Sequence, residues 1–210
     1  QFLQDEQMLF QENRHFLLPN FPSLKWARQN NKWDGIGPLK LVYVGHSLTS
    51  EGSYLSEVVT FLSSLKMKTT LSIYCLKPNE FIKEFERKDY DNLKVKIFDG
   101  LAYNELPIVL SQQHIGLILY KAKTPNYINN APNKLFEYLN CGLDVWYPQE
   151  MLGIHEYKTD TNPKVVCINF NQMERLNILE LTERKKGTRT FSYHAEAVYS
   201  KLLIALRKVS

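Results

Sequence analysis

An apolar run that ends in glycine decides the fold: Leu39-Lys40-Leu41-Val42-Tyr43-Val44-Gly45. Residues 53–65 follow it and carry apolar side chains at helical spacing, namely Leu55, Val58, Val59, Leu62 and Leu65. A buried strand, a glycine and an amphipathic helix in this order are typical of the first unit of a parallel α/β sheet. We therefore expect the main folded domain to begin at Leu39.

The alternation of strand and helix continues along the rest of the chain. Apolar patterning predicts further strands over 70–76, 93–98, 115–120, 143–147 and 164–169, and helices over 78–88, 103–113, 132–140, 173–186 and 191–207. The near-continuous apolar character of 41–44, 71–75 and 115–119 predicts neighbouring parallel strands, buried on both faces. Residues 93–98 alternate instead and are expected nearer an edge. The sequence thus predicts an α/β fold, a doubly wound, mostly parallel Rossmann-like sheet of about six strands.

The segment before Leu39 has a different character. Residues 5–14 have the pattern of a short polar helix, and 23–38 combine Gly and Pro with several Asn and Lys, a linker composition. Because the sequence begins with Gln1 rather than Met, we expect a natural start further upstream. We predict that residues 1–38 are the remnant of an amino-terminal domain with an interdomain linker. Residues 39–210 then form the sheet domain with its closing helices.

Charge and hydropathy limit the partners. The net charge is +4, and Lys and Arg are spread among Asp and Glu without a basic stripe, so nucleic acid is not an expected partner. A mildly basic surface suits an anionic small ligand or peripheral contact with an anionic membrane face. No apolar run reaches the roughly 18 residues that a membrane span requires.

The cysteines indicate a reducing compartment. Cys75, Cys141 and Cys167 are odd in number and far apart, and each lies in or beside an apolar segment. This pattern predicts buried free thiols and a cytoplasmic protein. The histidines make no metal-ligand spacing with them, so no metal site is expected.

One segment carries the clearest functional signal: Asn129-Asn130-Ala131-Pro132-Asn133-Lys134-Leu135-Phe136-Glu137. Pro132 suits the first position of a short helix that ends before Gly142. The start of this helix is expected at the carboxyl edge of the sheet, where free N–H groups and the helix dipole favour an anion such as a phosphate. Glu137 follows Lys134 on the same face and can accept hydrogen bonds from ribose hydroxyls. The alternative is an ordinary surface Lys–Glu pair.

Residues 132–145, Pro-Asn-Lys-Leu-Phe-Glu-Tyr-Leu-Asn-Cys-Gly-Leu-Asp-Val, resemble the donor-site segment of GT-B-fold glycosyltransferases, especially the large retaining family. In the same enzymes, the approach to this site resembles residues 103–107 with 115–117, the linker between the two domains resembles 18–22, and the closing segment of the carboxyl-terminal donor-binding domain resembles 191–193. The resemblance implies that Glu137 binds the nucleotide ribose. It implies that Asn133, Lys134 and Leu135 lie near the diphosphate or sugar, and that Gly45 lets the backbone approach the phosphates.

The sequence departs from this family at several positions. Asn129 replaces a second glutamate beside the donor sugar, and Asp144 replaces a usual proline. His46 stands where many members have arginine, and 45–53 contain no Lys or Arg. His46 either contacts a donor phosphate or sugar or is an ordinary loop histidine. Asn129 and Asn130 belong to a polar cluster after the fourth strand that either holds the sugar or base or is simply solvated.

The resemblance implies transfer of a sugar from a nucleotide diphosphate sugar to a glycan or lipid-linked acceptor, as in polysaccharide biosynthesis. The nucleotide sugar is a substrate, and no cofactor or metal is expected. The acceptor would bind through the missing amino-terminal domain, so these residues alone are expected to be inactive. No catalytic residue is identified. The alternatives are a non-catalytic nucleotide-sugar-binding or scaffold module, and a nucleotide-sugar epimerase of the same fold.

Overall fold

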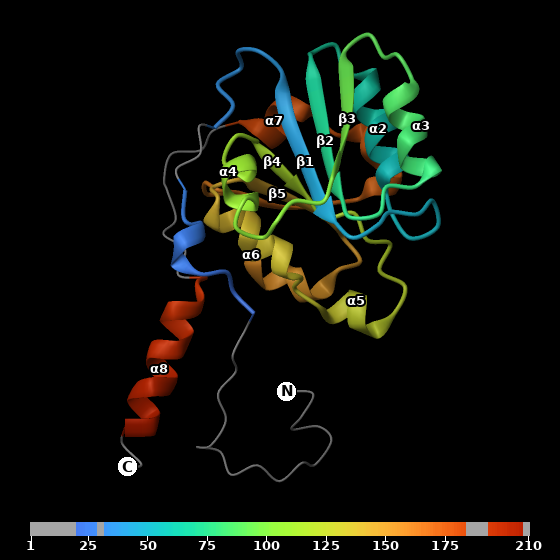
Figure 1. Cartoon of the computed structure of the whole chain (residues 1–210). Helices are drawn as coiled ribbons and strands as arrows, with labels where there is room; N and C mark the ends of the chain where they lie inside the picture. The colour runs from blue at the N-terminus through green and yellow to red at the C-terminus, as the bar shows by residue number, and fades with distance from the viewer. Residues whose placement is uncertain (1–19, 29–31, 184–192, 208–210) are drawn as a thin grey trace.

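The computed structural model describes residues 20–28, 32–183 and 193–207. Six strands form one parallel sheet in the order β3-β2-β1-β4-β5-β6 (Figure 1). They are β1 (Leu39–Gly45), β2 (Thr69–Cys75), β3 (Leu93–Asp99), β4 (Ile115–Leu117), β5 (Asp144–Pro148) and β6 (Val165–Ile168). The chain runs outward from β1 in one direction and from β4 in the other, so the topological switch point lies between them. The predicted doubly wound α/β fold is confirmed.

Helices cover both faces of this sheet (Figure 1). One face carries α2 (Leu55–Ser64), α3 (Glu80–Arg87) and α7 (Ile178–Thr182), and the other carries α4 (Leu106–Leu110) and α6 (Asn133–Asn140). The remaining elements are η1 (Leu24–Trp26), α5 (Pro125–Asn129), η2 (Leu152–Tyr157), η3 (Phe170–Arg175) and α8 (Ala195–Arg207).

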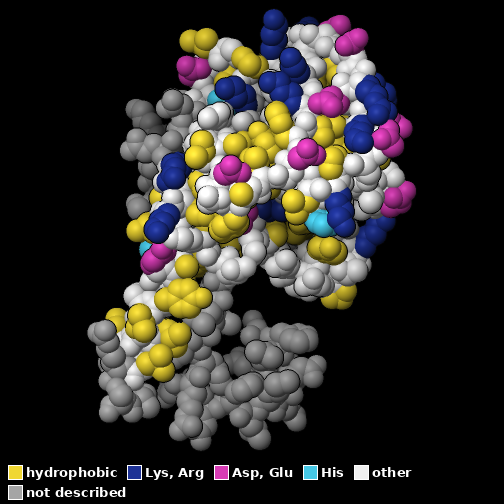
Figure 2. All heavy atoms as spheres, viewed as in Figure 1, with side chains coloured by type: hydrophobic (Ala, Val, Ile, Leu, Met, Phe, Trp, Pro, Cys, Tyr) yellow, Lys and Arg dark blue, Asp and Glu magenta, His cyan; other side chains and the backbone are white. Residues whose placement is uncertain are grey.

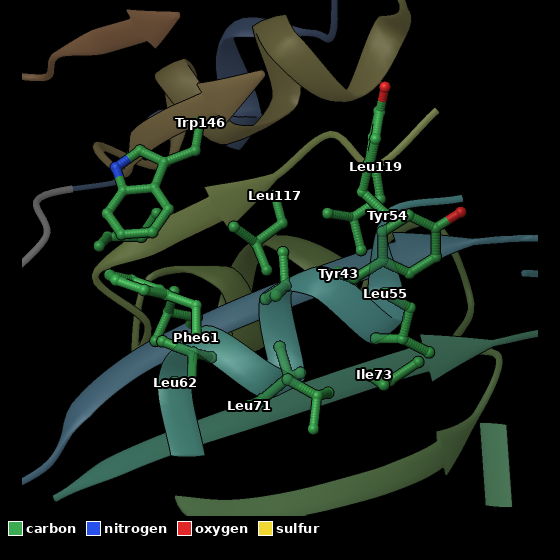
Figure 3. Packing of buried hydrophobic residues seen from close by; sticks show 14 of the residues in the cluster. Tyr43, Tyr54, Leu55, Phe61, Leu62, Leu71, Ile73, Leu117, Leu119 and Trp146 are labelled. Atoms are coloured by element: carbon green, nitrogen blue, oxygen red, sulfur yellow. The ribbon is translucent and has the colours of Figure 1, made fainter. Parts of the chain in front are cut away.

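Strand alternation produces one apolar core on each face. On β1, Leu41 and Tyr43 belong to the core under α2, which Figure 3 shows together with Leu55, Leu62 and Trp146. Val42, between them, belongs to the core under α6. As predicted, β1 lies between β2 and β4 as a buried parallel strand, and β3 is at the edge.

Several predicted boundaries are wrong. The helix expected over 103–113 is only α4, because the chain before it forms a turn in which Glu105 N donates to Ala102 O. The helix expected over 173–186 is divided after Arg175, because Asn177 caps α7 by accepting a hydrogen bond from Leu179 N. The strand expected over 115–120 ends at Leu117. The predicted helix over 5–14 and the residues 184–186 and 191–192 lie outside the described residues.

Helix α5 was not predicted from the sequence, although its signal is present. Thr124 accepts a hydrogen bond from Tyr127 N, and Pro125 begins the helix. The next helix, α6, begins one residue later than expected. Pro132 is extended there (φ −70°, ψ 151°) and precedes the helix as its cap, whereas Gly142 lies just beyond the end with a positive φ of 77°, as predicted.

A tyrosine hydroxyl joins the two halves of the sheet. β1 and β4 pair only through Leu41 with Ile115 and Val42 with Gly116. Beyond these pairs, the Tyr138 hydroxyl on α6 accepts a hydrogen bond from Val44 N (3.1 Å) and donates one to Leu117 O (3.4 Å). A Cβ atom at Gly116 would lie 2.3 Å from the Tyr138 ring, so the glycine allows α6 to pack closely on β4.

Residues before Leu39 pack against α6. Trp26 is buried, and the Phe21 ring lies 4.5 Å from the Phe136 ring. Ala195 N, at the start of α8, donates to Pro22 O (2.9 Å). The segment 20–28 thus connects α6 with α8, and the domain boundary at residue 38 stays a prediction.

The surface is mixed in charge. Figure 2 shows basic and acidic side chains interspersed around apolar ones on the face in view. On α8, the same view shows a group of apolar side chains, and Tyr199, Leu203, Ile204 and Leu206 are exposed. Within the described residues, no helix has both the length and the apolar character that crossing a bilayer requires.

At the amino edge of the sheet, polar groups are held in a partly buried network. Asp144 pairs with Lys32 (2.7 Å) and accepts a hydrogen bond from Lys164 N (2.7 Å). Lys40 N donates to His114 Nδ1 (3.0 Å). Asp144 therefore has a structural role at the edge opposite the carboxyl ends of the strands.

Acidification is expected to destabilise the domain through His114. Burial lowers the pKa of His114 from 6.5 to about 4, so the neutral ring is favoured in the folded state. This stability is fully present above pH 6.5 and is lost as pH falls toward 4. The loss is about 1–2 kcal/mol after allowance for solvent screening of the partly exposed ring. Thermal unfolding between pH 7 and 4.5 should show a smaller pH dependence in His114→Gln than in wild type. The exposed control His46→Gln should retain the wild-type slope, and an equal slope in His114→Gln would refute this origin.

Candidate functional site

Two loops meet at the carboxyl edge of the sheet, above the switch point. We call residues 46–54 after β1 and 118–124 after β4 the crevice loops. Ser53 and Tyr120 form an antiparallel bridge, with Tyr54 N donating to Leu119 O (2.9 Å) and Lys121 N to Gly52 O (3.0 Å). Ligands of doubly wound sheets bind at this edge. The crevice loops are therefore the expected walls of a site, and they are tied to each other.

The start of α6 lies at the same switch point because Tyr138 anchors this helix to β1 and β4. No side chain caps the helix, so its first turn offers N–H groups to a ligand. The Asn133 side chain is exposed, whereas Leu135 is fully buried and donates its N–H to Pro132 O (2.9 Å). Asn133 is thus open to a ligand, and Leu135 has a packing role.

Lys134 lies inside the protein rather than on the helix surface. The residue is only 8% exposed, and among the described residues its Nζ has no hydrogen-bond partner. Nζ lies 4.4 Å from the centre of the Tyr43 ring and 4.5 Å from that of Tyr120. We call Tyr43, Tyr120 and Lys134 the tyrosine cage. Burial lowers the pKa of Lys134 from 10.5 to about 7, against the opposing influence of Glu137. The alternative of an ordinary surface lysine is wrong.

Glu137 is the nearest anionic neighbour of this lysine on α6. It is half-buried, and burial raises its pKa, while the charge of Lys134 acts in the opposite direction. Glu137 and Lys134 therefore influence each other's charge, although no salt bridge or hydrogen bond joins them within the described residues. A half-buried carboxylate can accept hydrogen bonds from a pair of hydroxyls, as a ribose would offer.

Gly45 has a structural reason for being glycine. A Cβ atom there would lie 2.3 Å from the Tyr43 hydroxyl, so Gly45 makes room for the cage tyrosine. His46 has an exposed side chain, and its carbonyl accepts a hydrogen bond from Lys77 N (3.0 Å). The placement of Gly45 and His46 on a wall opposite α6, around one cavity, stays a prediction.

Asn129 and Asn130 are exposed next to η2. The Asn129 amide donates to Pro125 O (3.0 Å) within α5. Its carbonyl lies so close to Gly153 that a Cβ atom there would approach it to 2.3 Å. In this arrangement the Asn129 side chain supports its own helix, and a role in sugar binding stays a prediction for both residues.

Several polar groups in and beside the crevice loops were not predicted from the sequence. The Tyr54 hydroxyl donates to Glu150 (2.6 Å), and Lys121 pairs with Glu57 (2.9 Å). Tyr43 and Tyr120 were also missed, because they read as ordinary apolar positions of a strand. The sequence signal that could have placed Tyr43 at the site was its position two residues before Gly45, at the carboxyl end of the strand.

The cysteines follow the prediction in part. Cys75 and Cys141 are buried free thiols, but Cys167 is partly exposed, with Sγ 4.0 Å from His155 Nε2. Burial raises the pKa of Cys75 and Cys141 above the usual thiol value. Within the described residues, no group of three or more His, Cys, Asp or Glu side chains is arranged to hold a metal ion.

Comparison with known proteins assigns no family to this chain. No protein-family model matches the chain, and no curated protein is significantly similar to it.

Proposed function

We propose that this chain is the nucleotide-sugar-binding, carboxyl-terminal half of a GT-B-type glycosyltransferase. The observation that carries the proposal is Lys134, a buried amine without a hydrogen-bond partner among the described residues, at the switch point of a doubly wound sheet. A buried cation is costly unless an anion is close. A diphosphate is an anion of suitable size and charge, and helix starts at this edge of such sheets are common phosphate sites.

In this proposal the diphosphate lies on the first turn of α6, near Asn133 and Lys134, and the ribose lies on Glu137. Helix N–H groups and the lysine would then neutralise the charge that develops on the departing nucleoside diphosphate during sugar transfer. The acceptor would bind to a preceding domain. A peripheral membrane location and a cytoplasmic compartment belong to the same proposal.

A non-catalytic binding module is the second candidate. It is favoured by residues 45–53, which offer no basic side chain to the phosphates, and by the mutual ties of the crevice loops. Transfer of radiolabelled sugar by a longer protein that includes the preceding domain separates the two candidates. Turnover supports the enzyme, and tight nucleotide binding without turnover supports the module.

These residues alone are expected to transfer no sugar, because the acceptor cleft of a GT-B enzyme needs both domains. The measurement is release of nucleoside diphosphate from UDP-, GDP- and ADP-sugars with a panel of glycan acceptors. Robust turnover by these 210 residues would contradict the two-domain proposal.

Replacing Glu137 with Ala is expected to weaken nucleotide binding by about 1.5–3 kcal/mol, the scale of hydrogen bonds to a charged group. A thermal-shift screen with UDP, GDP, ADP and CMP first identifies the best nucleotide, and calorimetry then measures its affinity. Glu174→Ala, at an exposed glutamate on η3, is the matched control and should bind as wild type does. Unchanged affinity in a folded Glu137→Ala protein would show that this glutamate does not contact the ligand.

A further inference from the structure

The tyrosine cage is assembled from three separate elements. Tyr43 comes from β1, Tyr120 from the crevice loop after β4, and Lys134 from the first turn of α6. The ring faces of Tyr43 and Tyr120 attract the ammonium form without supplying a counter-charge. A ligand that enters between the crevice loops and α6 would therefore meet a lysine whose charge no anion fully balances.

Burial is the dominant influence on the pKa of Lys134, and the titratable groups around it have smaller effects. They are Tyr43 on β1, Cys75 on β2, Tyr120 in the crevice loop, Tyr127 on α5, and Glu137 and Tyr138 on α6. Burial raises the pKa of Tyr43 and Tyr138 well above the usual value and that of Tyr120 to about 12, so these hydroxyls are neutral at physiological pH. Glu137 is the carboxylate in this group, and it offsets burial only in part because Lys134 still has a pKa of about 7. The free protein thus holds Lys134 in both charge forms near neutral pH.

We propose that the tyrosine cage makes ligand capture proton-coupled: when a diphosphate binds at the start of α6, Lys134 takes up a proton and pairs with it. This inference rests on the proposed function and deepens it. A phosphate dianion within a few ångströms restores the charged form of a lysine, because opposite charges favour ionisation. By linkage, the affinity for diphosphate falls as pH rises above 7, by up to tenfold per pH unit, until the lysine of the complex itself deprotonates.

Calorimetry of nucleoside diphosphate binding in buffers of different ionisation enthalpy tests the proposal. The probe is whichever of UDP, GDP and ADP binds tightest, at pH 8.5, where its phosphates are fully ionised and cannot themselves take up the proton. Wild type is expected to take up about one proton on binding, since a group with a pKa near 7 is almost wholly neutral at this pH. Lys134→Arg, which stays charged, is expected to take up almost none.

Two further variants show whether the rings set the proton equilibrium. Tyr120→Phe keeps a ring face beside Lys134 and should retain the proton uptake. Tyr120→Leu removes the ring and should shift the midpoint of the curve of affinity against pH. His46→Gln tests the exposed histidine as the proton acceptor: whatever its effect on the affinity, it should retain the proton uptake, and loss of the uptake would overturn the assignment of the proton to Lys134.

The outcomes separate the inference from the proposed function. Binding without proton uptake at pH 8.5, or equal uptake in Lys134→Arg, would overturn the proton coupling and leave the nucleotide site intact. Absence of binding by every nucleoside diphosphate would overturn the proposed function and the inference together. Uptake that disappears in Lys134→Arg and survives in Tyr120→Phe would establish the coupling.

Discussion

Replacing Lys134 with Met is expected to raise the free energy of unfolding by about 1–4 kcal/mol at pH 7, the gain seen when buried charges are exchanged for apolar side chains of similar volume. Lys134 is buried between two tyrosine rings, without a hydrogen-bond partner among the described residues. A methionine is unbranched like lysine and only one heavy atom shorter, so it can fill the space between the rings without the desolvation penalty of an amine. The lysine at this position thus lowers the stability of the fold, although it is the side chain proposed to pair with the diphosphate.

The pH dependence of this effect has a definite sign. The pKa of Lys134 falls from 10.5 to about 7 on folding. Between these values the unfolded chain binds more protons, so the lysine destabilises the fold fully at pH 7 and below and less as pH rises toward 10. The advantage of Lys134→Met should therefore be larger at pH 7 than at pH 9.

Urea unfolding of both proteins at pH 7, 8 and 9 measures this advantage. Lys123→Met, at an exposed lysine of the crevice loop, is the control and should change stability by no more than about 0.5 kcal/mol. A Lys134→Met protein that is less stable than wild type would mean that the amine has a partner that offsets its burial.

Replacing Gly116 with Ala is expected to lower the free energy of unfolding by about 3 kcal/mol, the upper range for overpacking a core. The added Cβ would lie 2.3 Å from the fully buried Tyr138 ring, which cannot move aside without losing its hydrogen bonds to β1 and β4. Denaturant unfolding followed by circular dichroism gives the value.

The control for this change is Gly52→Ala, where the added Cβ meets only the Thr49 hydroxyl, a side chain that can rotate away. The double variant Gly116→Ala with Tyr138→Ala should cost less than the sum of the two single changes, because the clash is removed with the ring. Simple additivity would show that Gly116 acts through something other than contact with Tyr138.

The fold could be predicted from sequence because its main determinants are local. Nearly continuous apolar runs such as 71–75 indicate that a strand is buried on both faces. The alternation of such strands with helices predicts a parallel sheet. Element ends were less predictable because they depend on single side chains. Asn177 divides a helix that apolar spacing alone would continue.

The candidate site could be predicted only along one helix. Lys134 and Glu137 are close in sequence, so their spacing brings them together on any helix. The tyrosine cage depends on Tyr43 on β1 and Tyr120 in the crevice loop after β4, which are distant from Lys134 in sequence and meet it only in the folded domain. No pattern within a single strand or loop indicates that these three side chains come into contact. The alternative of a surface Lys–Glu pair is therefore wrong for Lys134, which is buried at the expected position on the helix.

The short pairing between β1 and β4, which involves only two residue pairs, has a consequence for how the chain folds. Strands β1 to β3 come from one continuous stretch, 39–99, and β4 to β6 from another, 115–168, so each half can assemble from contacts between neighbours in sequence. Joining the halves closes a much longer loop, and loop closure of this kind slows the formation of non-local strand pairs. The Tyr138 hydroxyl completes that closure. Native-state amide exchange should accordingly resolve two cooperative units that meet at Val44, with the tyrosine cage formed only when both are in place.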